Sequence, residues 1–133
     1  MKKSDDKAFQ SQWPLIKNYL VAKIKLNEVE PTKHAREQMT ERDIELAAVY
    51  DIARFWNIDE MYQPEEYPYG KIAFKNPDPV FSITGQDARG RKLTIAFALK
   101  KKSRELSFMI VTAFFESERK KNRHQLYLDN NSF

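Results

Sequence analysis

The sequence predicts a single α+β domain, with N-terminal helices packed on one face of a three- to four-stranded antiparallel sheet. Three observations predict this class. The chain has 133 residues, which suits one domain. Hydrophobic residues make up 41% and aromatic residues 13%, enough for a packed core although 32% of the residues are charged. The spacing of apolar residues changes along the chain, from helical in the first half to alternating in the second.

The first helix is predicted from about Ser11 to Leu26. Ser11 can cap it, and Pro14 is tolerated in a first turn, where no intrahelical N–H is yet required. One face of this helix is apolar, with residues at spacings of three and four: Trp13, Ile16, Leu20 and Ile24. We interpret this face as a stripe that covers the core.

Two more helices are predicted before residue 58. Thr32 can cap a short helix, Lys33–Met39. The next helix begins after Thr40 or Asp43, either of which could cap it, and ends near Asn57. Its apolar residues keep helical spacing: Ile44, Ala47, Ala48, Ile52 and Phe55.

The strands come after residues 63–70, which are rich in Pro, Glu and Tyr and are predicted to form a loop. We predict strands at Lys71–Lys75, Val80–Thr84, Arg91–Lys100 and Leu106–Phe115. Tight turns are expected at residues 86–90 and 100–104. Consecutive hairpins of this kind form an antiparallel meander, one face of which the helices must cover.

Composition excludes several classes of function. The chain has no cysteine, so disulfides, zinc ribbons and thiol catalysis are excluded. Its 3 glycines are too far apart for a phosphate-binding loop. No apolar run approaches the roughly 20 residues that span a bilayer, and no signal peptide is recognised, so we expect a cytoplasmic protein without membrane contact. We expect no metal and no cofactor. Residues 1–10 are expected to be flexible, residues 11–116 to form the domain and residues 117–133 to form a polar tail.

Positive charge is concentrated in the second half. Residues 1–66 hold 10 Lys and Arg against 13 Asp and Glu, whereas residues 67–133 hold 13 against 6. A basic sheet face would suit a polyanion such as RNA. Ordinary solvated loops explain the surplus equally well.

The densest polar segment is residues 34–44. His34 and Gln38 are one helical turn apart, and Arg42 would join them if the helix continued. A histidine can transfer a proton, and an arginine can stabilise the charge on a phosphorane-like transition state. The alternative is a charged solvent face with one ordinary histidine.

The same segment resembles the opening motif of a family of small bacterial domains of unknown function, His-Ala-x-x-Arg-Met-x-x-Arg-Gly-Ile. The matching residues are His34, Ala35, Met39, Arg42 and Ile44. A closing Val-Thr-x-aromatic pattern matches within residues 110–115, so the resemblance covers about residues 32–116. The family is grouped with the RelE-like ribonuclease toxins of the barnase–EndoU–colicin–RelE fold.

The resemblance implies metal-independent cleavage of RNA, in which a 2′-hydroxyl attacks the adjacent phosphate. It makes His34 the candidate general acid or base, Arg42 the candidate phosphate clamp and Thr112 the candidate strand hydroxyl. Weaker candidates for nucleic-acid binding are basic residues on or beside strands: Lys71, Arg91 and Lys92. An antitoxin-like protein partner would fit a domain of this kind that binds without cleaving RNA.

Two departures favour an alternative. Gln38 replaces the first arginine of the motif and carries no charge, and Asp43 replaces its glycine. The chain could therefore be a non-catalytic domain that binds a protein or a nucleic acid, the latter through Lys100, Lys101 and Lys102. The tyrosines at positions 62, 67 and 69 either stack on unpaired bases or cover the edge of the core.

Overall fold

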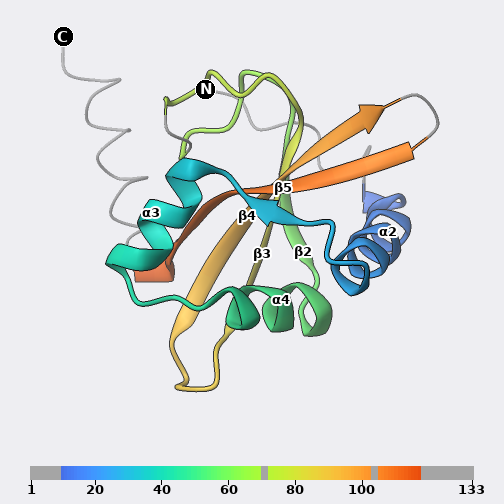
Figure 1. The fold of residues 1–133 in the computed structure, drawn as a ribbon. Helices are drawn as coiled ribbons and strands as arrows, with labels where there is room; N and C mark the ends of the chain where they lie inside the picture. The colour runs from blue at the N-terminus through green and yellow to red at the C-terminus, as the bar shows by residue number, and fades with distance from the viewer. Residues whose placement is uncertain (1–9, 70–71, 103–104, 118–133) are drawn as a thin grey trace, which may run out of the picture.

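The computed structural model describes residues 10–69, 72–102 and 105–117 (Figure 1). The helices of this part of the chain are α2 (Trp13–Lys25), α3 (Lys33–Glu41) and α4 (Leu46–Phe55). The strands are β1 (Glu30–Pro31), β2 (Ile58–Tyr62), β3 (Val80–Gln86), β4 (Lys92–Lys102) and β5 (Glu105–Phe115). The α+β class is confirmed. Across the described ranges, no helix is both long and apolar enough to pass through a membrane.

The strands form one mixed sheet in the order β1-β5-β4-β3-β2. The pairs from β2 to β5 are antiparallel, as predicted for consecutive hairpins. β1 pairs in parallel with β5 over two residues, Glu30 with Met109 and Pro31 with Ile110. The sheet therefore has five strands and is not purely antiparallel, in contrast to the three- to four-stranded antiparallel sheet that the sequence predicted.

The predicted strand at residues 71–75 is wrong. Residue 71 lies outside the described residues, and residues 72–75 form turns, with Phe74 at a φ of 62°. The strand that the prediction missed is β2, in which a bulge at Asp59 breaks the alternation of inward and outward side chains. β1 was also missed, because two residues carry no periodic signal.

The ends of the helices depend on single residues. Thr32 caps α3 as predicted, because its Oγ1 accepts a hydrogen bond from the Ala35 amide at 3.1 Å. Neither Thr40 nor Asp43 caps α4, which follows Glu45 without a side-chain cap. Asp43 instead terminates α3 with a φ of 54°. The motif of the resembling family has glycine at this position, and glycine adopts this conformation without strain.

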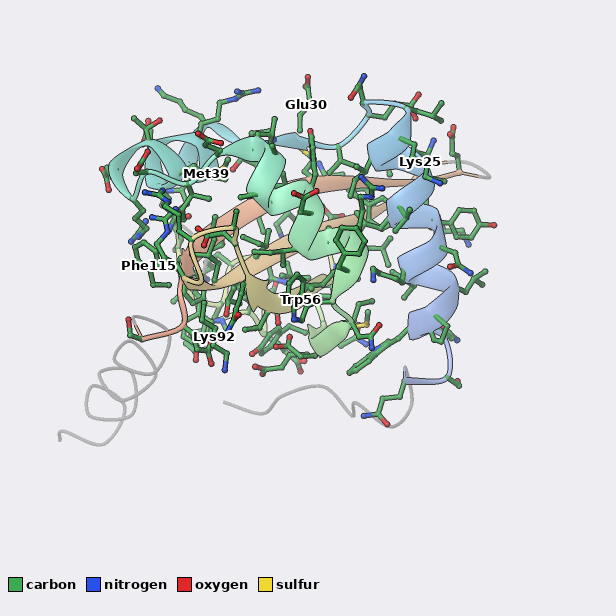
Figure 2. The ribbon with its side chains drawn as sticks, turned by 90° about the horizontal axis from the view of Figure 1, so that it is seen from below. Lys25, Glu30, Met39, Trp56, Lys92 and Phe115 are labelled. Carbon is green, nitrogen blue, oxygen red and sulfur yellow. The ribbon has the colours of Figure 1, made fainter. Side chains whose placement is uncertain are left out.

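Two hydrophobic clusters lie on opposite faces of the sheet. The larger joins buried residues of the three helices to alternate residues of β4, namely Leu93, Ile95 and Phe97. The smaller contains Ala96 of the other face, together with Tyr62, Tyr67 and Val80. On the first side, α4 lies between α3, which carries Met39, and α2, which ends at Lys25 (Figure 2). The segment after β2 lies over the second face.

Candidate functional site

His34 lies in the first turn of α3 and lines a pocket of about 440 Å³ on the sheet face opposite the larger cluster. The floor of this pocket is apolar and is formed by residues of three strands, including Val80, Ala98, Met109 and Val111. Its basic side chains are Lys33, Lys75 and Lys100. We call this cavity the His34 pocket. It combines a histidine, which can transfer protons, with three lysines around an apolar surface.

Two contacts attach α3 to the edge of β5 and so position His34. The Thr32 amide donates a hydrogen bond to the Ile110 carbonyl at 2.9 Å, just after the β1–β5 pairing. One turn beyond His34, the Gln38 side chain accepts a hydrogen bond from the Ala113 amide at 3.1 Å. Gln38, which replaces the first arginine of the motif, therefore satisfies a backbone donor of β5.

The loop between β2 and β3 forms the outer wall of the His34 pocket, and Asn76 holds it in place. The Asn76 side chain donates to the carbonyls of Gln63 and Asp78 and accepts from the Tyr67 amide, at 2.8–3.0 Å. The carboxylate of Asp78 lies 3.9 Å from the Lys100 ammonium group. A partly exposed pair at this distance is weak, so Lys100 can turn toward an anionic ligand.

Thr112 does not line the His34 pocket. It is on the same face of the sheet, one residue beyond Val111, but only 1% of its surface is exposed. Its hydroxyl and the phenol oxygen of Tyr67 are both buried and lie close together. Burial raises the pKa of Tyr67 well above its ordinary value, and the nearby Thr112 hydroxyl opposes this shift in part. Tyr67 is therefore a neutral group at physiological pH.

The tyrosines of this region mainly cover the core edge. Tyr62 and Tyr67 are almost fully buried and meet edge-to-face, with ring centroids 5.2 Å apart. Tyr69 continues the aromatic contact to Phe114 at 5.7 Å. Of the two interpretations of the tyrosines, the structure favours the covering role over base stacking for Tyr62 and Tyr67.

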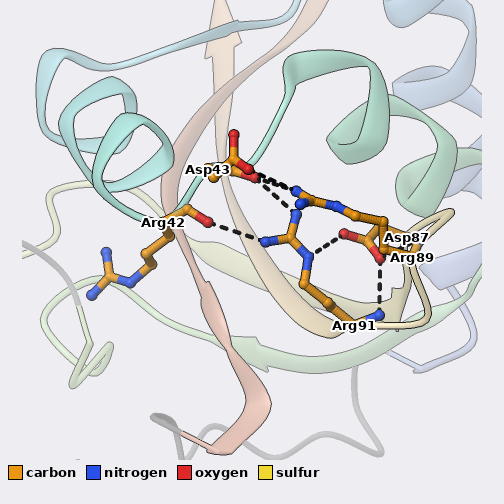
Figure 3. A network of polar contacts seen from close by, with 5 residues as sticks. All are labelled: Arg42, Asp43, Asp87, Arg89 and Arg91. Carbon is orange, nitrogen blue, oxygen red and sulfur yellow. Dashed lines mark hydrogen bonds and ion pairs between the residues drawn. The ribbon is translucent and has the colours of Figure 1, made fainter.

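Arg42 and Arg91 belong to a polar network at the far end of α3 (Figure 3). The guanidinium group of Arg91 binds the Asp87 carboxylate at 2.7 Å and donates to the backbone carbonyls of Arg42 and Asp43. Arg89 also binds Asp43, at its carbonyl and its carboxylate. The Arg42 side chain points away from this network. Neither arginine lines the His34 pocket.

The basic residues that the sequence predicted to bind nucleic acid lie in several separate parts of the structure. Lys100 lines the His34 pocket, and Lys92 lines a second pocket at the opposite end of the same face. Lys101 is exposed and, by the alternation of β4, points to the other face of the sheet. Lys71 and the side chain of Lys102 lie outside the described residues. The structure thus joins His34 and Lys100, but not Arg42 or Thr112.

Sequence reasoning missed two lysines of the His34 pocket. Lys33 is adjacent to His34 and could have been included from its position in the same helical turn. Lys75 comes from the loop before β3, and no sequence signal places that loop over the sheet. Within the described ranges, no three His, Cys, Asp or Glu side chains are close enough to hold a metal ion.

The family comparison covers the part of the chain that builds this pocket. Residues 32–115 match the model of a family described as Domain of unknown function (DUF4258). The chain belongs to this family. The DUF4258 segment begins at the cap of α3 and ends at the last residue of β5, so α2 lies outside it. Neither a curated protein nor a solved structure matches the chain significantly.

Proposed function

We propose that the His34 pocket binds a single-stranded segment of RNA and that this DUF4258 domain is a metal-independent endoribonuclease of RelE-like toxin type. The observation that carries this proposal is the convergence of His34 with Lys33, Lys75 and Lys100 around an apolar floor. An unpaired base would contact the floor, and the adjacent phosphates would meet the lysines. The sequence resemblance described above supports the same class of activity.

Cleavage would use these groups as follows. The His34 imidazole accepts the proton of a ribose 2′-hydroxyl, whose oxygen then attacks the adjacent phosphorus. The bond to the 5′-oxygen of the next nucleotide breaks, which leaves a 2′,3′-cyclic phosphate, and the departing oxygen takes up a proton from water. Lys100, and with it Lys33 or Lys75, stabilises the negative charge on the phosphorus oxygens. Thr112 has no role in these steps because its hydroxyl is buried.

The test is cleavage of labelled single-stranded RNA by the purified protein in the presence of EDTA. We expect products with cyclic phosphate ends, none from an RNA with 2′-deoxyribose at the cleaved position, and none with His34→Ala. Failure to cleave a varied set of RNAs would refute the nuclease proposal.

A second candidate function is RNA binding without cleavage. It is favoured by the fact that His34 is the one histidine among the side chains that line the described pocket, whereas efficient cleavage uses both an acid and a base. Fluorescence anisotropy of labelled RNA at several salt concentrations separates binding from cleavage. Lys100→Ala should weaken binding and lower the salt slope by about 0.7.

Lys101→Ala provides the matched control for Lys100→Ala. It removes the same charge from the neighbouring position of β4, but from the opposite face of the sheet. We expect it to change RNA affinity much less. Equal effects of the two substitutions would show that the strand contributes only nonspecific charge.

A further inference from the structure

Asp78 is the one acidic side chain among the described residues that line the His34 pocket. The register of β3 and β4 pairs Val80 with Ala98. Continued toward the loop, this register places Asp78 opposite Lys100, so both side chains lie on the pocket face of the sheet. A carboxylate repels phosphate, so phosphate binding by the lysines does not explain why it is there. Its position indicates that the pocket also meets a group that donates hydrogen bonds.

The backbone on both sides of Asp78 is fixed. Pro77 and Pro79 flank this residue and restrict the conformations that the segment can adopt. The Asn76 side chain donates to the Asp78 carbonyl at 2.8 Å, and the Leu99 amide of β4 donates to the Pro79 carbonyl at 2.9 Å. The carboxylate therefore extends from a rigid segment that is attached to the sheet.

The Asp78 carboxylate is accessible to a ligand. Its side chain is 32% exposed, and its one partner among the described residues is the Lys100 ammonium group at 3.9 Å. This separation is too long for a hydrogen bond. A ligand can therefore replace Lys100 at the carboxylate, and Lys100 is then available for a neighbouring phosphate.

The four RNA bases differ in what they offer to a carboxylate. Guanine has two donors side by side on its Watson–Crick edge, the N1–H and the 2-amino group, which can meet both oxygens at once. Adenine and cytosine have a single amino group beside an unprotonated ring nitrogen, whose lone pair would face the second oxygen. Uracil has a single N–H between two carbonyls. Guanine is therefore the base that suits a carboxylate best.

The His34 pocket has the room and the apolar surface for such a base. Its volume of about 440 Å³ lies within the range of about 300–1,000 Å³ that is usual for small-ligand sites. Met109 and Val111 belong to its floor, and Ile72 of the loop, which is 65% exposed, also lines it. These side chains can contact the faces of a base whose edge meets Asp78.

We propose that the His34 pocket is selective for guanine, with the N1–H and the 2-amino group of the base directed to the two carboxylate oxygens of Asp78. This inference rests on the proposed binding of RNA at the same pocket and adds the base that the pocket selects. When guanine takes the place of Lys100 at Asp78, the ammonium group turns to the phosphate beside the guanosine.

Fluorescence anisotropy of labelled tetranucleotides that differ in one base tests the proposal. Their sugars carry 2′-fluorine, which cannot attack the phosphate, so binding is measured without cleavage. The variable position holds guanine, hypoxanthine, adenine, cytosine or uracil, and the other positions hold uracil. We expect guanine to bind about tenfold more tightly than adenine, cytosine or uracil, the discrimination of one bidentate base contact. Hypoxanthine, which lacks the 2-amino group, should be intermediate. Guanine that binds no more tightly than adenine would overturn the proposal.

Two variants separate the contact with Asp78 from a general effect of charge. Asp78→Asn keeps one acceptor oxygen and adds a donor, so it should remove most of the guanine preference without weakening the binding of the all-uracil tetranucleotide. Glu65→Gln is the matched control, because it removes a negative charge from an exposed position of the same loop that does not line the pocket. It should leave the preference unchanged. A guanine preference that persists in Asp78→Asn, in protein with a wild-type circular dichroism spectrum, contradicts the role of Asp78.

The same titrations separate this inference from the RNA-binding proposal on which it rests. Equal, saturable binding of all five tetranucleotides would support RNA binding and refute guanine selectivity. Failure of every tetranucleotide to bind would refute both. The comparison of guanine with hypoxanthine uses the wild-type protein alone, so it decides the question even if Asp78→Asn does not fold.

Discussion

Gly85→Ala is a sharp test of the contact between the Trp56 indole ring and the backbone of Gly85 near the end of β3. A Cβ added at Gly85 would lie only 2.8 Å from Cγ of the Trp56 ring. Cγ is bonded directly to the Cβ of Trp56, so rotation of the ring about its own axis cannot move it away. The whole side chain must change its χ1 rotamer, or β3 must move away from the indole.

The size of the effect follows from two opposing terms. Overpacking of this kind costs about 1–3 kcal/mol. Replacing glycine by alanine within a strand contributes about 0.5–1 kcal/mol in the opposite direction, because alanine has less backbone freedom to lose on folding. We therefore expect Gly85→Ala to lower the free energy of unfolding by about 1–2 kcal/mol, the difference between these terms.

Urea denaturation of a double-mutant cycle with Trp56→Ala measures the two terms separately. In the Trp56→Ala background the steric conflict is absent, so Gly85→Ala should become neutral or stabilising by up to about 1 kcal/mol. The decisive result is that Gly85→Ala lowers the free energy of unfolding in the wild type but does not lower it in the Trp56→Ala background. If Gly85→Ala were equally destabilising in both backgrounds, the indole would not lie against Gly85.

Three further predictions concern the contacts made along α3 and in the polar network at its C-terminal end. Thr32→Ala should lower the free energy of unfolding by about 1 kcal/mol because α3 loses its cap. Thr32→Ser keeps a hydroxyl that can cap the helix, so it should retain most of the wild-type stability in the same urea assay. Gln38→Ala should cost about 1–3 kcal/mol because the Ala113 amide loses its acceptor; Gln38→Glu, which keeps an acceptor, should cost less, and equal losses would argue against this contact. Burial raises the pKa of Asp87, but the hydrogen bonds from Arg91 and a neighbouring amide lower it below the ordinary 3.8. The carboxylate thus stabilises the fold at neutral pH, and this contribution should be lost as the pH falls below about 4 in urea titrations of the wild type but not of Asp87→Asn.

Local signals predicted much of the fold. The spacing of Ile16, Leu20 and Ile24 predicted the buried face of α2, and all three are buried. Thr32 predicted the start of α3 because capping involves only residues within one turn. The alternation of Leu93, Ile95 and Phe97 predicted β4 and the face that it buries. In each case the physical cause lies within a few residues of the chain.

Bulges explain much of what the sequence did not predict. In β2, Asp59 and Glu60 follow one another on the same face, so the alternating pattern is broken. In β5, the register shift opposite Ala96 and Phe97 places Val111 and Thr112 together on the face away from the larger cluster. A single sequence carries no signal for such a shift, because the partner strand decides it.

By itself, the sequence determined the α+β class, the principal helices, the three long strands and the candidate His34. Tertiary structure decided which charged groups meet. It placed His34 and Lys100 in the lining of one pocket, paired Arg91 with Asp87 and buried Thr112 next to Tyr67. Helix and strand periodicity depend on neighbours along the chain and can be read directly. Contacts between groups dozens of residues apart depend on strand order, register and the path of the loop over the sheet, which no local pattern encodes.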